Sequence, residues 1–257
     1  MSRFEQLDEL MLNQGQNERF RLGTTLTVGT CLAPALIGEL EQSLTGLEVY
    51  SFVSNTHEIE EKLLKSELDA AVVEGEIQSP DLVVIPIIED CLVLGCGSRH
   101  PFFEKIQISN SELNGQCFAM REQGSGTRQL FEDYVKRHHI SIKVTWEANC
   151  PRTIINAVIW NKVLSVMSLR LLTHELAHEK IRVFYDEKQE WNRKFKLVYH
   201  KNKFPVHIQE QVFPEEPRSR TQYDFDLYPV SYLQNTRHTT CLLNNNAMAL
   251  SSVTLKT

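Results

Sequence analysis

Eight consecutive residues, REQGSGTR at 121–128, give the strongest local signal for binding chemistry in this sequence. They follow a short apolar stretch and open a helical pattern. Gly124 and Gly126 permit a close backbone approach and a positive φ. The hydroxyls of Ser125, a candidate N-cap, and Thr127 would lie beside the unpaired N–H groups of the first helical turn. Together with the helix dipole these donors could bind an anion, although a glycine-rich helix start whose hydroxyls only cap fits the same residues.

Two further loops offer polar groups at predicted helix starts. Thr30 and Cys31 follow a strand predicted at 26–29, and Asn55 and Thr56 follow the next predicted strand. Each pair could serve either as a helix cap or as a ligand contact.

A third pattern indicates different chemistry. His174, Glu175 and His178 match HExxH, which on a helix can place two imidazoles on one zinc ion with the glutamate as general base. At 100° per residue, however, the histidines fall nearly opposite Leu172 and Leu176 and would face solvent. A zinc hydrolase is therefore kept only as an alternative, and we expect no catalytic residue, no metal ligand and no cofactor.

Composition narrows the class of protein. The 257 residues are 42% hydrophobic, and 27 basic against 33 acidic side chains give a formal charge of −6. Such a surface repels phosphate backbones on average, so DNA contact would need a segment that this chain lacks. The acidic start of the chain has no apolar core of a signal peptide, and no run approaches the roughly 20 apolar residues of a membrane span, so we expect a cytoplasmic protein. Six scattered cysteines without a CxxC pair are typical of buried thiols in a reducing compartment.

The elements that must position these groups alternate between short apolar runs and helical patterns. Strands separated by helices in this way indicate βαβ units and parallel sheets. The periodicity resets near 96–101 and again at 186–193, which predicts two α/β lobes joined by two crossing strands, with a ligand at the carboxyl ends of the strands between the lobes. Strands are predicted at 26–29, 47–53, 68–73, 82–94 (broken by Pro86), 116–121, 142–147, 164–168, 181–185 and 195–200, and helices at 34–43, 57–65, 125–138, 153–162 and 171–177.

Both ends of the chain have a weaker pattern. Phe4, Leu7, Leu10 and Met11 recur at helical spacing, as in a short helix that packs either on its own domain or on a partner helix. After residue 213 no period is sustained, and we expect an irregular tail over 214–257.

Five segments in order resemble the effector-binding (substrate-binding) domain of LysR-type transcriptional regulators. The run 121–128 resembles the form found in regulators of sulfur metabolism and their relatives. The resemblance covers about residues 26–213. The other segments are LTVGT at 26–30 with Pro34, SNTHEI at 54–59 followed by 64–75, the crossover at 86–94 with His100-Pro101, and FKLVYHK at 195–201.

The resemblance implies a two-lobed fold like that of type II periplasmic binding proteins, each lobe a mostly parallel sheet with flanking helices. It implies a linker helix remnant at 1–22, lobe I at 23–96 and 194–213, and lobe II at 97–193. It also implies a cytoplasmic homodimer or tetramer that binds a small effector, an oxyanion or small carboxylate, in the interlobe cleft to control transcription, without membrane contact. The implied ligand-facing residues are Thr30, Cys31, Asn55, Thr56, Ser125, Gly126 and Thr127, with Asn149 and Ser168 on the second lobe.

Three departures from the family pattern matter. The N-terminal winged helix-turn-helix is missing, so DNA would be bound only through that missing domain. Asn161 and Lys162 stand where the family often has glycines, and the tail matches no expected helix. A transport-type solute-binding protein of the same fold is the alternative function, against which the lack of a signal peptide counts.

Overall fold

The computed structural model describes residues 18–186, 188, 190–202 and 239–243, and in it the chain forms two compact units. Of the described residues, the first contains those up to Asp90, the segment 124–126 and residues 193–202; the second contains the rest, including 239–243. The strand Leu92–Gly97, which we expected in the first lobe, lies in the sheet of the second unit. Within the described ranges no helix combines the length and apolarity needed to cross a membrane.

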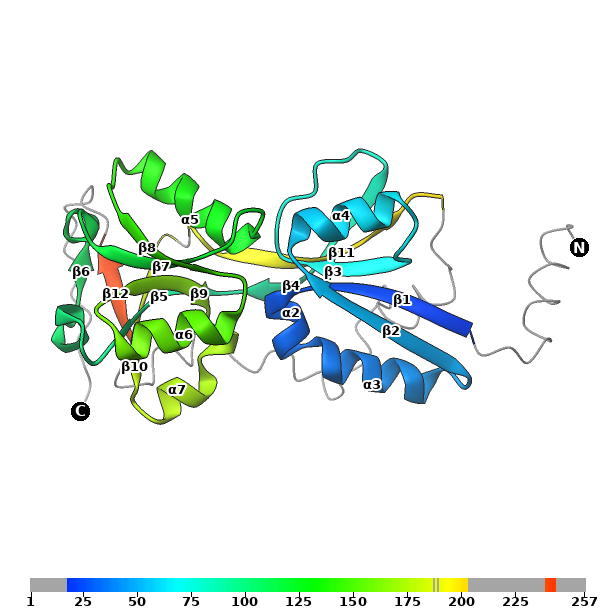
Figure 1. Ribbon diagram of the computed structural model, residues 1–257, viewed down its shortest axis with the longest axis horizontal. Helices are drawn as coiled ribbons and strands as arrows, with labels where there is room; N and C mark the ends of the chain where they lie inside the picture. The colour runs from blue at the N-terminus through cyan, green and yellow to red at the C-terminus, as the bar shows by residue number, and fades with distance from the viewer. Residues whose placement is uncertain (1–17, 187, 189, 203–238, 244–257) are drawn as a thin grey trace, which may run out of the picture. The chain divides into compact units, whose positions relative to one another are not determined.

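The first unit is built on a five-stranded sheet in the order β2-β1-β3-β11-β4 (Figure 1). The strands β2, β1 and β3 are parallel, whereas β11 is antiparallel to both β3 and β4, so four of the five strands run in one direction and only β11 runs in the other. Its elements are β1 (Glu18–Thr25), α2 (Leu26–Cys31), α3 (Ala33–Ser43), β2 (Leu47–Ser54), α4 (Thr56–Leu64), β3 (Ala70–Val73), β4 (Leu82–Asp90) and β11 (Arg193–His200).

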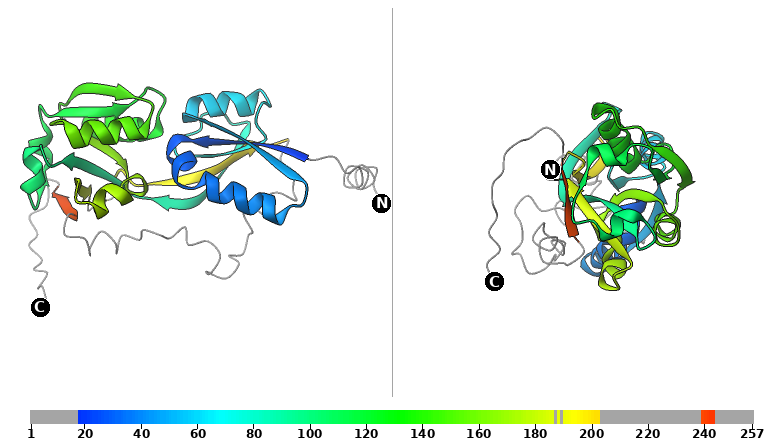
Figure 2. Two further views of the ribbon diagram at one scale, coloured as in Figure 1. Left: turned by 60° about the horizontal axis from the view of Figure 1, so that its bottom comes forward. Right: turned by 90° about the vertical axis from the view of Figure 1, so that its left-hand side faces the viewer.

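Helices cover both faces of this sheet, as Figure 2 shows for α3 and α4. Alternate residues of β3 divide between the two layers because successive strand side chains point to opposite faces. Ala70 and Val72 belong to the cluster that contains Leu36 of α3, whereas Ala71 and Val73 pack with Ile59 and Leu63 of α4. The sheet is therefore buried on both sides, and its carboxyl-terminal edge is where polar residues can gather.

The first strand was predicted at the wrong position, at 26–29. Residues 26–29 lie in α2, and the strand precedes them as β1. Threonine, valine and glycine are poor helix formers, so local propensity favoured a strand; burial of Val28 and Leu32 in the layer between α3 and the sheet outweighs it. The same shift ends the expected linker helix early, because residues 18–22 belong to β1 and 1–17 lie outside the described residues.

The second unit is also a mixed α/β layer structure, with the strand order β6-β12-β10-β5-β9-β7-β8. Helix α5 packs on one face of the sheet, and α6 and α7 pack on the other. Its elements are β5 (Leu92–Gly97), η1 (Pro101–Glu104), β6 (Ile108–Ser109), η2 (Asn110–Leu113), β7 (Cys117–Arg121), α5 (Gly126–Arg137), β8 (Lys143–Ala148), α6 (Pro151–Trp160), β9 (Leu164–Ser168), η3 (Leu169–Leu171), α7 (Thr173–Ala177), β10 (Ile181–Asp186) and β12 (Thr239–Leu243).

Part of the expected irregular tail is regular. The strand β12 lies parallel to both β10 and β6, so residues 239–243 complete the second sheet. The rest of 214–257 lies outside the described residues.

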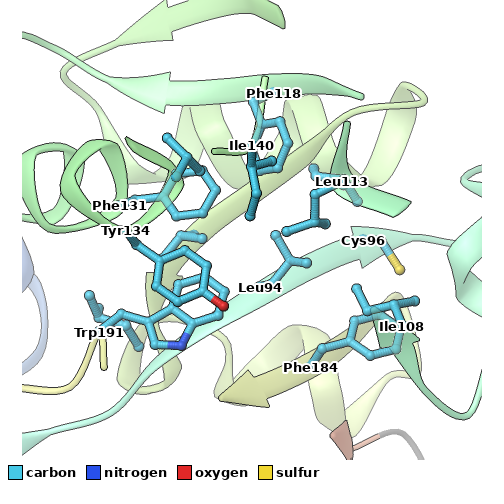
Figure 3. Packing of buried hydrophobic residues seen from close by; sticks show 14 of the residues in the cluster. Leu94, Cys96, Ile108, Leu113, Phe118, Phe131, Tyr134, Ile140, Phe184 and Trp191 are labelled. Carbon is cyan, nitrogen blue, oxygen red and sulfur yellow. The ribbon is translucent and has the colours of Figure 1, made fainter. Parts of the chain in front are cut away.

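Aromatic rings form the centre of the second unit's core (Figure 3). The Trp191 and Tyr134 rings are stacked with centroids 4.7 Å apart and an interplanar angle of 6°, and Phe131 stacks on Trp191 at 5.6 Å. All three side chains are fully buried. Such stacking adds to the hydrophobic stabilisation. It also fixes the position of Trp191, which lies two residues before the chain returns to the first unit at Arg193.

Candidate functional site

The carboxyl ends of β1, β2 and β3 meet at one edge of the first unit's sheet. The register pairs Thr25, the last residue of β1, with Ser54, the last residue of β2, and pairs Thr24 with Val72 near the end of β3. Helices α3 and α4, which follow β1 and β2, cover opposite faces of the sheet, so this edge is a point where the winding direction reverses. Ligands of open α/β sheets bind at such points.

Three buried hydroxyls in this unit, those of Thr24, Thr25 and Ser125, lack a hydrogen-bond partner among the described residues. The side chains of Thr25 and Ser125 are only 1% and 3% exposed, and neither oxygen has a partner among the residues described. A buried hydroxyl without a partner costs about 1–3 kcal/mol. Unsatisfied buried polar groups are uncommon in folded proteins, so these hydroxyls mark a candidate site.

A tight backbone stack places Ser125 at this edge. The hydroxyl of Thr56 accepts a hydrogen bond from the N–H of Gly75 at 3.2 Å, just beyond β3. A Cβ added to Gly126 would lie 2.5 Å from the Cα of Gly75, and one added to Gly75 would lie 2.5 Å from the Thr56 hydroxyl oxygen. Only glycine therefore fits at either position, and the glycines of the run 121–128 serve this close approach.

The loop just before Ser125 contacts the start of α4. Gly124 has a φ of +83°, and a Cβ there would lie 3.5 Å from the side chain of Asn55. Asn55 is the N-cap of α4, and its side-chain oxygen accepts the Glu58 N–H at 3.0 Å. The residues predicted from the second loop, Asn55 and Thr56, thus lie together with Ser125 and Gly126, but each already makes one structural hydrogen bond.

The residues predicted from the first loop lie elsewhere. Thr30 is exposed on α2 and donates a hydrogen bond to the Leu26 carbonyl at 2.7 Å, while Cys31 is half-buried against the α3 layer. The strand ends four residues earlier than predicted, so the strand end lies at Thr25 rather than just before Thr30. Thr25 was not predicted from the sequence, although the threonine pair that follows FRLG at 20–23 could have indicated it.

Three predicted residues belong to the second unit. Thr127 is buried in the first turn of α5, and Asn149 is exposed after β8. Ser168 is the last residue of β9, and its hydroxyl accepts the Arg170 N–H at 3.2 Å. Two of the three therefore follow or end strands, as the resemblance implied.

Both arginines of the run 121–128 are occupied in ion pairs. Arg121 makes two contacts with the Glu122 carboxylate, at 2.8 and 3.0 Å. Arg128 binds Glu132 at 2.6 Å and Glu147 at 2.5 Å, and it donates to the Arg121 carbonyl at 3.0 Å. Burial lowers the pKa of Arg128, but these two carboxylates outweigh it and raise that pKa overall. The guanidinium groups of Arg121 and Arg128 are therefore engaged in ion pairs and hydrogen bonds within and beside the run 121–128.

The HExxH segment does not have the arrangement of a zinc hydrolase. His174 and His178 lie on the surface, as predicted, with ring centroids 4.2 Å apart. Glu175 is 1% exposed and pairs with Arg152, so it is not oriented as a general base over the two imidazoles. Within the described part of the chain no three His, Cys, Asp or Glu side chains group as metal ligands.

Comparison with known structures identifies the fold as that of type II periplasmic binding proteins in the form found in LysR regulatory domains, as predicted. The Synechocystis PCC6803 CcmR regulatory domain in complex with 2-PG matches with a TM-score of 0.69 and 28% identity, over 76% of this chain and 94% of that one. The reduced OxyR regulatory domain from Pseudomonas aeruginosa has a TM-score of 0.63 at 21% identity, over 77% and 96% of the two chains.

The family described as LysR substrate binding domain matches residues 13–210, and the chain belongs to this family. Its curated relatives are named as regulators of transcription. The regulator CysL of Bacillus subtilis (strain 168) is 25% identical over 179 residues, which are 70% of this chain and 60% of CysL. A probable RuBisCO transcriptional regulator of Cyanidioschyzon merolae is 29% identical over 167 residues, 63% and 55% of the two chains. The chain thus spans less than two thirds of either relative.

Proposed function

We propose that this chain is the effector-sensing domain of a LysR-family transcriptional regulator and that it binds a small anionic molecule at the carboxyl ends of β1, β2 and β3. The observation that carries the proposal is that the buried hydroxyls of Thr25 and Ser125, like that of Thr24, have no partner among the described residues, in the unit whose strand ends also present Asn55 and the Gly75–Gly126 contact. The matched CcmR regulatory domain was solved in complex with 2-PG.

Binding would act without chemistry on the ligand. Hydroxyl, amide and backbone N–H donors hold an anion by hydrogen bonds, and the start of α5 adds the favourable end of a helix dipole. The ligand alters transcription only if it binds one arrangement of the regulator more tightly than another. In the whole protein that difference would reach a DNA-binding domain, as the relatives' names imply.

A thermal-shift panel tests this proposal, with 2-PG, sulfate, sulfite and shikimate as probes and the parent chain as reference. A ligand at 100 times its Kd stabilises a protein by about 2.7 kcal/mol, which raises the melting temperature by roughly 5–10 °C for a chain of this size. The response should disappear in Thr25→Val and in Ser125→Ala, but should persist in Thr30→Ala, because the Thr30 hydroxyl is bound to its own helix. Equal responses in all four proteins would refute the placement of the site.

We also propose that the chain forms a homodimer through its exposed edge strands. The strand β8 ends its sheet, and its side chains are exposed from Lys143 to Glu147, including Trp146 at 43%. The strand β2 ends the other sheet and exposes Tyr50 and Val53 at 43% and 48%. Exposed apolar edges commonly pair with another chain. Light scattering after size exclusion should give a dimer for the parent and a monomer for Trp146→Lys; an unchanged mass would place the interface elsewhere.

A further inference from the structure

A buried ion cluster lies where the chain leaves and re-enters the first unit. The guanidinium of Arg193 binds Asp90 at 2.9 Å and Glu74 at 3.2 Å, and it approaches the hydroxyl of Thr27 at 3.5 Å. The side chains of the three charged residues are between 0% and 4% exposed. Asp90 is the last residue of β4, and Arg193 is the first residue of β11.

Each partner of Arg193 lies close in sequence to a residue of the candidate site or on a strand that connects the two units. Glu74 directly precedes Gly75, which carries the Thr56 and Gly126 contacts. Thr27 lies two residues beyond Thr25, whose buried hydroxyl has no partner in the described structure. Asp90 belongs to the strand that continues into the second unit.

The two crossings are short. One residue, Cys91, separates Asp90 from Leu92, and one residue, Asn192, separates Arg193 from Trp191. Leu92 and Trp191 are both fully buried in one core cluster of the second unit. Each crossing therefore has only a single residue between the Asp90–Arg193 pair and a buried core residue of the second unit.

The ladder between β4 and β11 is interrupted just before this pair. Phe195 pairs with Ile88 but Lys196 pairs with Pro86, so the register shifts by one residue at Ile87. Pro86 has no N–H to donate, and it is tolerated because β4 is an edge strand. The bulge and the proline separate the last three residue pairs, which end in Asp90–Arg193, from the continuous part of the ladder. In this end segment, Arg193 contacts Glu74, which follows β3, and Thr27 of α2.

We propose that Arg193 is a positioning residue that couples occupancy of the strand-end site in the first unit to the two crossings into the second. The inference rests on the proposed function for its ligand. Its physical basis is the fork of the guanidinium, which bridges two carboxylates and a hydroxyl from three elements at once. A lysine ammonium is a single point donor and cannot reproduce that geometry.

Hydrogen exchange of the full chain, with and without 2-PG or sulfate, tests the coupling. The variant is Arg193→Lys, and the control is Arg21→Lys, because Arg21 also makes a bidentate ion pair, with Asp69, but in the middle of β1 rather than beside its carboxyl end. Without ligand, Arg193→Lys should raise exchange at 72–76, 86–90 and 26–29 together, by roughly tenfold, whereas the control should raise it only near 20–23 and 68–70. A rise confined to 193–195 would overturn the proposal.

With ligand, protection in the parent should appear at 72–76 and 124–126 and extend to 88–92. In Arg193→Lys the protection should remain at the first two segments and be lost at 88–92; protection that still reaches 88–92 would overturn the coupling.

If neither probe protects 72–76 in the parent, the proposed function fails for those probes, while the ligand-free comparison still decides the role of Arg193. If Arg193→Lys does not fold, the neutral triple variant Glu74→Gln, Asp90→Asn, Arg193→Met replaces it with the same expected outcomes, because it leaves no buried charge unpaired.

Discussion

The hydroxyl of Thr56 holds the backbone N–H of Gly75 at 3.2 Å, and this one hydrogen bond ties the start of α4 to the end of β3. It also fixes the surface on which Gly126 rests, since the Gly75 Cα lies 2.5 Å from the position of a Gly126 Cβ. The glycine pattern and the hydroxyl pattern of the sequence are therefore parts of a single packed stack.

Gly126→Ala should lower the free energy of unfolding by about 1–3 kcal/mol, because the added methyl group meets backbone that cannot move aside, and it should abolish any ligand-induced thermal shift. Gly38→Ala is the matched control: no atom lies within 4 Å of its Cβ position in α3, and there alanine should stabilise by about 0.5–1 kcal/mol. Urea unfolding measures both. A Gly126→Ala variant as stable as the parent would contradict the tight stack.

Thr25→Val should leave the stability of the ligand-free chain unchanged or raise it slightly, because it removes a buried hydroxyl that has no partner among the described residues. Thr56→Val should instead destabilise by about 1 kcal/mol or more, since it leaves the Gly75 N–H without its acceptor. The two replacements are chemically identical, so the difference in their melting temperatures isolates the hydrogen bond. Equal losses would mean that the Thr25 hydroxyl is satisfied in solution.

Stability should fall as the pH decreases through the range in which His100 titrates. Burial lowers the pKa of His100 below its ordinary value of 6.5, and the Phe102 N–H donates to its neutral Nδ1. A proton therefore binds the unfolded chain more readily, and the stability contributed by the neutral ring is lost from about pH 6.5 downward to the folded-state pKa.

Urea midpoints at pH 7.5 and 5.5 test this, with His100→Asn as a variant that retains an acceptor but does not titrate. The pH dependence over this interval should be shallower in the variant. Glu112 and Glu175 do not interfere, because their pKa values are lowered from 4.5 and their contribution is lost only in more acidic solution. An unchanged slope would show that His100 is not the titrating group.

Two cysteines should differ sharply in reactivity. Hydrogen bonds from Thr153, and the nearby charge of Arg121, lower the pKa of the exposed Cys150 thiol, whereas burial raises that of Cys96 to about 12. Because the thiolate is the nucleophile, iodoacetamide at neutral pH should label Cys150 first among the cysteines whose surroundings are described, and Cys96 only after unfolding. Mass spectrometry of peptides over time measures the order, and Cys150→Ser identifies the fast site. Early labelling of Cys96 would contradict its burial.

Much of this architecture could be predicted because the spacing of apolar residues along the sequence indicates which face of each helix or strand is buried. The alternation of β2 and the two faces of α4 follow directly from the sequence, and so does the strand–glycine loop–helix order around Ser125. The first strand was displaced because its neighbour α2 is built from residues that favour strands, whereas the burial of Val28 in a cluster with residues far along the chain is not visible in the local sequence.

The site was predictable in part for the same reason. Asn55 and Ser125 could be identified as residues at helix starts, which is a local property. Thr25 depended on the exact end of β1, and the ion pairs of Arg193 join residues 103 and 119 positions apart, which no local pattern indicates.

The position of β11 has a consequence for how the chain is made. This strand lies between β3 and β4, yet it is synthesised about a hundred residues after them. During synthesis β4 has no neighbour to pair with until β11 emerges, so the first sheet cannot be completed before most of the second unit has left the ribosome. A nascent chain that stops short of Arg193 would expose one side of β3 and all of β4, both rich in apolar residues, and such chains are natural substrates for chaperones and proteases.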